Sequence, residues 1–191
     1  MGAFCILVAM LVLYIIVRNN KEKAVLIRSA QTDALTGVYN KENTQNMIDE
    51  ILRKKDPDSF HGFLILDMDH FKEVNDVYGH AMGDKVLEML GNFLKKQFRE
   101  QDVIGRIGGD EFVILLYNIG SRQNMENRVK SLQEKIREIH MDGMEGHTFT
   151  LSAGIAFAPQ DGDTFMELYQ KADLALYQVK RSGRNGYRIY K

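Results

Sequence analysis

The stretch RIGGDEFVILL, residues 106–116, places two glycines and two adjacent carboxylates directly before a run of apolar residues. A short apolar run of this kind is typical of a buried strand. A second short apolar stretch ends at Gly108 and Gly109, so the two segments predict a pair of strands joined at the glycines. Asp110 and Glu111 would then lie at the edge of a sheet, where solvent or a ligand can reach them.

Helical and extended patterns alternate on both sides of this hairpin. Helices are predicted over 41–54, 82–98, 122–139 and 164–181, and strands over 61–67, 102–109, 111–119, 147–159 and 185–191. Helices interleaved with a central hairpin favour an α+β fold with a mainly antiparallel central sheet flanked by helices. We expect a ferredoxin-like, polymerase-palm-like domain preceded by an N-terminal hydrophobic helix.

The hydrophobic helix is expected over residues 1–17, because residues 3–17 contain no charged and no strongly polar side chain. A membrane span needs roughly 20 apolar residues and at least about 17, a limit that this run just reaches. No basic residue precedes the run and no small-residue cleavage site follows it, which argues against a signal peptide. The segment is therefore interpreted as a transmembrane helix or the remnant of one, with a core or oligomerisation helix as the alternative.

The remainder of the chain suits one globular domain. We expect a helical connector, suited to dimer formation, over 18–32 and a single domain over 33–191. The basic residues that follow the apolar run place residue 18 and those after it in the cytoplasm. A net charge of −1 gives no broad basic field, so nucleic acid is not an expected partner. The single cysteine, Cys5, cannot form an internal disulfide, and no Cys/His cluster indicates zinc.

Carboxylates end one predicted strand and begin another. Asp67 and Asp69 follow a buried strand, so they would converge with Asp110 and Glu111 if the two strands are neighbours. Repulsion between close carboxylates is relieved by a divalent cation or a shared proton, and hard oxygen ligands suit Mg²⁺ or Mn²⁺. Taken alone, the same residues also fit an ordinary hairpin turn with solvated acids, and this alternative stays open.

Further motifs accompany the hairpin in a fixed order. RIGGDEF is preceded by DALTGVYNK (33–41) and LDMDHFKEVNDVYGHAMGD (66–84), and is followed by SAGIA (152–156) and ADLALYQVKRSGRNGY (172–187). In these residues the sequence resembles the GGDEF domains, the diguanylate cyclases, which join two GTP molecules into cyclic di-GMP. The resemblance covers residues 33–190, with Lys41 where arginine is commoner.

The resemblance implies a metal site with two Mg²⁺ (or Mn²⁺) ions. Asp67 and Asp110 would bind the metal through their side chains, and Met68 through its backbone carbonyl. Glu111 would be a further ligand or the catalytic base. Metal ions would polarise the α-phosphate and favour the 3′-alkoxide. Whether Asp110, Glu111 or a metal-bound water takes the proton of the 3′-hydroxyl stays open.

The resemblance also implies a guanine pocket. Asn75 and Asp84 would bind the guanine edge, His80 would lie in the same pocket, and Gly108 and Gly109 would leave room for the nucleotide. A carboxylate suits the guanine N1–H and N2–H₂ donors, so GTP is expected to be preferred over ATP. As alternatives, the asparagine would cap a turn and the histidine would be packed in the core.

Three basic residues would neutralise the triphosphate in this family. Lys72, which is also a candidate catalytic residue, Lys180 and Arg184 would hold the phosphate oxygens. The alternative for the last two is a solvated helix end, where cations are favoured by the helix dipole.

A second site is implied upstream of RIGGDEF (106–112), the signature of the family. In REQD, residues 99–102, the family pattern makes Arg99 and Asp102 an inhibitory site for the product, with the arginine on a phosphate and the aspartate on the base. The alternative is a surface pair of little energetic weight. Product bound here would limit synthesis by holding two domains apart.

The chemistry implied by the family needs two facing domains, each with one GTP, so a homodimer is expected. The expected location is the inner membrane of a bacterium, with the catalytic domain in the cytoplasm. One rival interpretation is a catalytically inactive module that binds GTP or cyclic di-GMP. Another is a polymerase-like palm with different chemistry, since that fold has the same strand-end carboxylates.

Overall fold

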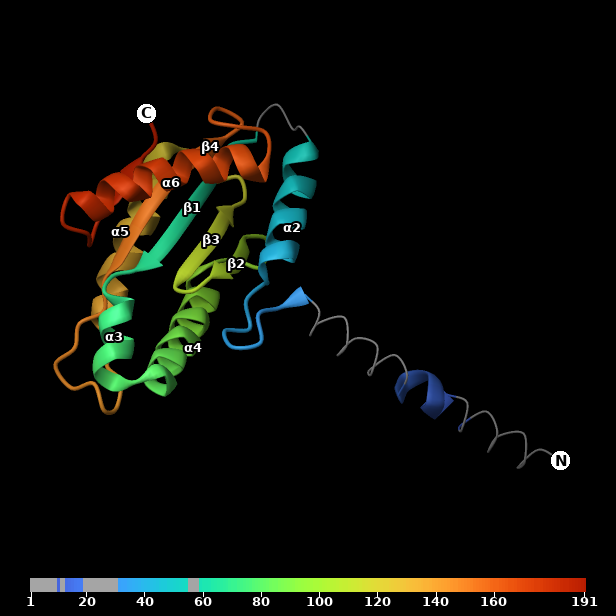
Figure 1. Cartoon of the computed structure of the whole chain (residues 1–191). Helices are drawn as coiled ribbons and strands as arrows, with labels where there is room; N and C mark the ends of the chain where they lie inside the picture. The colour runs from blue at the N-terminus through green and yellow to red at the C-terminus, as the bar shows by residue number, and fades with distance from the viewer. Residues whose placement is uncertain (1–9, 11–12, 19–30, 55–58) are drawn as a thin grey trace.

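A five-stranded sheet forms the centre of the protein, with the strand order β2-β3-β1-β4-β5 (Figure 1). The structure is a computed structural model that describes residues 10, 13–18, 31–54 and 59–191. Its strands are β1 (His61–Met68), β2 (Val103–Gly108), β3 (Glu111–Leu116), β4 (Leu151–Ala158) and β5 (Tyr187–Ile189). Neighbouring strands are antiparallel except β4 and β5, which are parallel. The prediction of an α+β fold around a mainly antiparallel sheet is therefore confirmed.

Helices cover both faces of the sheet. The helices are α2 (Lys41–Arg53), α3 (Phe71–Tyr78), α4 (His80–Gln97), α5 (Arg122–Arg137) and α6 (Phe165–Arg181). One hydrophobic cluster joins α2 and α6 to the sheet face that carries Phe63 and Ile65. A second cluster joins the other three helices to the opposite face, which carries Leu64 and Leu66. Because successive side chains of β1 point to opposite faces of the sheet, this strand contributes to both hydrophobic clusters.

Two elements differ from the sequence prediction. Helix α3 was not predicted, because its eight residues make little more than two turns and bury only Val74. It is separated from α4 by Gly79, whose φ of 82° is a conformation that favours glycine. Strand β4 begins four residues later than the strand predicted over 147–159, and it is buried at every position. Helices on both faces remove the solvent-exposed side that produces alternation.

Glycine lets one helix lie directly on the sheet. A Cβ atom built on Gly154 of β4 would lie 2.0 Å from the backbone oxygen of Ala172 in α6. No side chain fits in that space, so α6 contacts β4 through backbone atoms at this point. The residues of α6 on either side of this contact, including those toward its C-terminal end, are thereby fixed relative to the strand.

The predicted N-terminal segments are only partly described. Residues 10 and 13–18 are helical, while the remainder of the helix expected over 1–17 and most of the connector expected over 18–32 lie outside the described residues. Within the part of the chain that the structure describes, no helix has the length and apolar content needed to cross a membrane.

Candidate active site

Strand pairing brings the predicted carboxylates to one edge of the sheet. In the antiparallel register of β1 and β3, Asp67 is the direct partner of Glu111. On its other side, Asp67 is the partner of Ser152 in β4. Asp110 immediately precedes β3, in the turn where Gly109 has a φ of 53°. The conformation of this turn requires a residue that tolerates a positive φ.

A cavity of about 340 Å³ lies at this edge. It collects side chains from the end of β1, the start of α3, the signature turn and the C-terminal end of α6. It is lined by Asp67, Met68, His70, Phe71, Lys72, Glu73, Asp110, Lys180 and Arg184. Acidic and basic candidates that are far apart in the sequence therefore share one cavity. Three carboxylates and three lysine or arginine cations line it, a combination that suits an anionic substrate that carries a metal ion.

Asp67 is the most perturbed acid in the cavity. Burial raises its pKa to about 6, and the negative charges of Asp110 and Asp69 act in the same direction. The Lys180 ammonium, whose Nζ lies 2.7 Å from Asp67 Oδ2, opposes this rise. Burial also raises the pKa of Asp110. The protein therefore holds two carboxylates where their negative charge is costly without a nearby cation.

These residues fit a divalent metal that is shared with a substrate. Among the described residues, no group of three or more His, Cys, Asp or Glu side chains forms a complete metal site. Mg²⁺ is usually bound by one or two carboxylates together with phosphate oxygens. Asp67 and Asp110 would supply the carboxylates and Met68 a backbone carbonyl. The donor set therefore suits a metal that arrives with a nucleotide.

Glu111 makes a different contact from its neighbour. Its Oε1 accepts a hydrogen bond of 2.6 Å from the hydroxyl of Tyr169 in α6, and it does not line the cavity. Tyr169 was not singled out from the sequence, because it fits the apolar face of an amphipathic helix. Only the packing of α6 over the sheet shows that its hydroxyl meets the signature.

Asp69 has a structural environment. It is buried, and it accepts hydrogen bonds from Thr150 Oγ1 (2.8 Å), Ser152 Oγ (2.6 Å) and the backbone N–H of Asn185 (3.0 Å). The last bond ties β1 to the loop after α6, next to Arg184, whose φ is 63°. Asp69 therefore positions the loop that carries one of the cavity's cations.

The predicted guanine-binding residues lie on α3 and α4. A Cβ atom built on Gly83 would lie 1.9 Å from Asn75 Oδ1, so the two helices meet closely at a glycine. His80 and Asp84 are exposed and four residues apart on α4, which places them on one side of that helix. His80 is thus not the packed core histidine that was weighed as an alternative. None of the three lines the 340 Å³ cavity, nor do Gly108 and Gly109.

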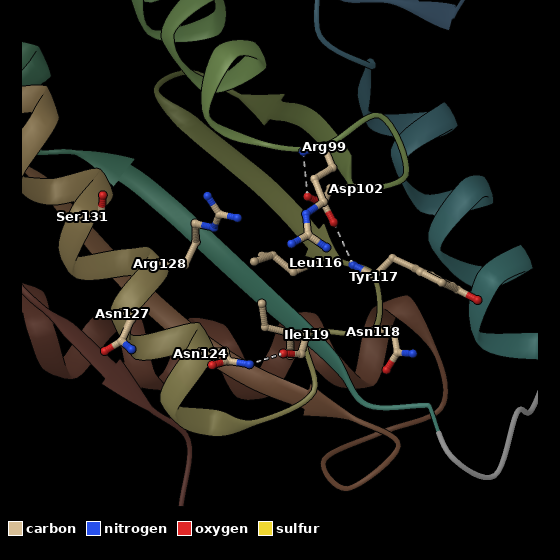
Figure 2. A pocket seen from close by; sticks show the side chains of 10 residues that line it. All are labelled: Arg99, Asp102, Leu116, Tyr117, Asn118, Ile119, Asn124, Asn127, Arg128 and Ser131. Carbon is tan, nitrogen blue, oxygen red and sulfur yellow. Dashed lines mark hydrogen bonds between the residues drawn. The ribbon is translucent and has the colours of Figure 1, made fainter.

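The predicted product site lies at the open end of the β2–β3 hairpin, away from the turn that carries Asp110. Arg99 and Asp102 line a pocket of about 430 Å³ together with Arg128 of α5, as Figure 2 shows. The Asp102 carboxylate accepts hydrogen bonds from the backbone N–H groups of Arg99 (2.9 Å) and Tyr117 (3.0 Å). Arg128 was missed in the sequence, since no motif links α5 to this loop. The pocket thus has two guanidinium groups and a carboxylate already engaged by the backbone.

One arginine links the N-terminal motif DALTGVYNK (33–41) to the signature turn at Gly109 and Asp110. Arg106 Nη1 lies 3.1 Å from Asp33 Oδ1, and Arg106 Nε donates to the carbonyl of Gly109 at 2.9 Å. The glycine is adjacent to Asp110, so the arginine holds the backbone of the residue before a cavity carboxylate. The sequence did not indicate this bridge, because both residues lie in separately recognised motifs.

Comparison with known proteins identifies the family. The family model described as "Diguanylate cyclase, GGDEF domain" matches residues 30–186. The chain belongs to the GGDEF family. Its signature turn is the segment that carries Asp110, and the matched region contains every residue of the cavity described above.

Curated GGDEF relatives are longer than this chain. Diguanylate cyclase TpbB of Pseudomonas aeruginosa is 36% identical over 177 residues, which cover 90% of this chain and 40% of that protein. Diguanylate cyclase DgcS of Shewanella oneidensis is 35% identical over 162 residues, which cover 84% of this chain and 53% of that protein. The chain therefore spans about half or less of the length of these relatives.

Solved GGDEF structures share the fold. The GGDEF domain of TpbB from Pseudomonas aeruginosa has a TM-score of 0.79 and 31% identity, covering 84% of this chain and 94% of that one. The coiled coil and GGDEF domain of DgcB from Caulobacter crescentus, in complex with c-di-GMP, has a TM-score of 0.80 and covers 92% of both chains. The latter is 23% identical, so it supports the fold alone.

Proposed function

We propose that this chain is a diguanylate cyclase, which condenses two GTP molecules into cyclic di-GMP and releases two pyrophosphates. The observation that carries the proposal is the cavity in which Asp67 and Asp110 meet Lys72, Lys180 and Arg184. It combines ligands for a metal with cations for a triphosphate. The membership of the family and the similarity to curated diguanylate cyclases support the same conclusion.

Each residue has a role that follows from its place in the cavity. Lys72 and Arg184 would bind the triphosphate as it enters. Lys180 now neutralises Asp67, and it would transfer its hydrogen bond to a phosphate oxygen when a divalent cation takes over the carboxylate. Bound Mg²⁺ would supply charge neutralisation at the α-phosphate and lower the pKa of the attacking hydroxyl. Asn75 and Asp84 would orient the guanine from the α3–α4 corner.

We further propose that the reaction takes place in a homodimer. One domain offers one nucleotide cavity, while the cyclic product needs a 3′-hydroxyl from each of two nucleotides to attack the other α-phosphate. Two cavities related by a two-fold axis meet this requirement. The helical connector expected over 18–32 would set the distance between the domains. The pocket at Arg99 and Asp102 would bind the product and limit synthesis, with Arg128 as a further phosphate ligand.

Membrane attachment through residues 1–17 stays part of the proposal. It would place the catalytic domain on the cytoplasmic side of a bacterial inner membrane. Fractionation of cells that express the full chain tests this: recovery in the membrane pellet, and release by detergent but not by salt, would support attachment. Recovery in the soluble fraction would contradict it.

The central test is incubation of the purified protein with GTP and Mg²⁺, followed by chromatography of the nucleotides. Cyclic di-GMP and pyrophosphate are the expected products, and none should form with Asp110→Asn or without Mg²⁺. A confirmed dimer that binds GTP but forms no cyclic di-GMP would overturn the enzymatic proposal. The same result would favour the alternative of an inactive GTP-binding module.

A further inference from the structure

We propose that Tyr169 is a positioning residue for the signature glutamate. Its hydroxyl donates to Glu111 Oε1 at 2.6 Å and thereby fixes the side chain beside the metal-binding carboxylates. The inference rests on the proposed cyclase function, because Glu111 is a candidate ligand or base of that reaction. Tyr169 belongs to none of the candidate site residues that the sequence predicts, and the proposal gives it a role in positioning Glu111.

The register of the sheet places the two carboxylates side by side. Asp67 and Glu111 are direct partners of β1 and β3, so their side chains lie on the same face. That face is the one covered by α6, as the shared core of Phe63, Ile65 and α6 residues shows. Helix α6 crosses this face of the sheet (Figure 1). The two neighbouring carboxylates therefore lie on the face that α6 covers, where groups from that helix can offset their mutual repulsion.

Helix α6 provides one partner for each carboxylate. Lys180 contacts Asp67 at 2.7 Å, and Tyr169 contacts Glu111 at 2.6 Å. The two residues lie about three turns apart on α6, so they emerge from the same side of the helix. Helix α6 thus supplies a cation to Asp67 and a neutral donor to Glu111, and both groups offset the repulsion between these two paired carboxylates.

The hydroxyl of Tyr169 is held in place as a donor. Its ring stacks on Phe165, with centroids 5.7 Å apart, and Phe165 packs against Phe63 of β1. A phenol is protonated at neutral pH, so it can only donate to the Glu111 carboxylate. The stack leaves the ring little freedom to turn away.

This arrangement predicts a loss of turnover rather than of substrate binding. In Tyr169→Phe the ring and its stack remain, while the hydrogen bond to a charged group is lost. Such bonds account for roughly tenfold to a hundredfold in an equilibrium or rate. We expect kcat to fall by at least about tenfold with KM for GTP within about twofold, since neither residue lines the nucleotide cavity.

Tyr177→Phe is the matched control. Tyr177 lies on the same helix, is 57% exposed, and contacts Arg181 through its ring, which phenylalanine retains. Its kcat and KM should equal those of the parent. If Tyr169→Phe also matches the parent, or if it raises KM with kcat unchanged, the positioning role is wrong.

A second measurement does not depend on activity. Urea unfolding of the parent, Tyr169→Phe, Glu111→Gln and the double variant gives the coupling between the two side chains. We expect the effects to be non-additive, and additive effects would show that the contact does not exist. Coupling without a change in kcat would make the contact merely structural and would also overturn the proposal. If the parent forms no cyclic di-GMP, the proposed function fails, and the coupling still tests the contact.

Discussion

Asp33 and Arg106, 73 residues apart in the sequence, form an ion pair that joins the N-terminal motif to the signature hairpin. The pair is partly buried, with side-chain exposures of 24% and 15%. Burial alone would raise the pKa of Asp33, but hydrogen bonds from Thr36 and the Arg106 guanidinium outweigh burial and lower it. Because Arg106 also donates to the Gly109 carbonyl, a single side chain joins the N-terminal motif to the turn that carries Asp110.

Replacement of this arginine should weaken both stability and turnover. Arg106→Lys keeps the charge but cannot bind Asp33 and Gly109 together, because lysine lacks the planar fork. We expect the free energy of unfolding to fall by about 1 kcal/mol and kcat to fall several-fold. Urea unfolding and the GTP assay measure the two effects. Arg188→Lys, at an exposed position of β5, should change neither, and an equal response from both variants would contradict the link.

The raised pKa of Asp67 predicts a pH dependence of stability in EDTA. The folded state binds a proton up to pH of about 6, whereas the unfolded carboxyl titrates near its ordinary value of 3.8. Between these values the folded state holds more protons, so this residue's contribution to the free energy of unfolding falls as pH rises. The contribution should therefore be larger at pH 4 than at pH 7.

Asp67→Asn removes this titration, so its stability relative to the parent should rise by about 2 kcal/mol between pH 4 and pH 7. Urea unfolding in EDTA at several pH values measures the difference. Asp76→Asn, at an exposed position of α3, is the matched control and should show no such trend. A constant difference between Asp67→Asn and the parent would show that the pKa of Asp67 is not raised.

The pocket in Figure 2 predicts a separable loss of product inhibition. Arg99→Ala and Arg128→Ala should each weaken cyclic di-GMP binding by tenfold or more, since each removes a charge-assisted contact to phosphate, worth about 1.5–3 kcal/mol. Initial turnover should be unchanged, because neither residue lines the catalytic cavity. Calorimetric titration with cyclic di-GMP measures binding. Lys96→Ala, which removes an exposed basic residue of the same region, is the control. Undiminished inhibition in Arg99→Ala would show that this pocket is not the inhibitory product site.

Asp84 should determine the preference for guanine. In Asp84→Asn one acceptor becomes a donor that faces the guanine N1–H and N2–H₂ groups. We expect KM for GTP to rise by at least about tenfold, in line with about 1–3 kcal/mol for a bidentate base contact. Competition by ATP should strengthen relative to GTP. Glu88→Gln, one turn further along the exposed side of α4, is expected to behave as the parent. A KM that stays constant would remove Asp84 from the guanine site.

The sequence predicted those features that depend on local pattern. The convergence of Asp67 with the signature carboxylates was predictable, because a strand end and a hairpin are local features and the family resemblance supplied their pairing. Helix α3 was not, since eight residues with one buried side chain have too short an apolar period to be distinguished from a loop. The order of helices and strands along the sequence was sufficient to predict the fold class.

Contacts across the fold were not predictable from the sequence. Tyr169, Arg128 and the Asp33–Arg106 pair each depend on the position of a helix or loop over a distant strand. A tyrosine on an apolar helix face looks like an ordinary core residue, and an arginine on an exposed helix looks like a solvated charge. Their partners become visible only when the elements are packed.

The backbone contact at Gly154 makes a residue without a side chain a determinant of the active-site dimensions. Helix α6 has no deformable side-chain layer between it and β4 at this point. Because Lys180 and Tyr169 belong to the same helix, a displacement of α6 over the sheet changes the Asp67–Lys180 and Glu111–Tyr169 distances together. Position 154 lies under the helix and does not line the 340 Å³ cavity, yet a larger residue there would shift both distances at once.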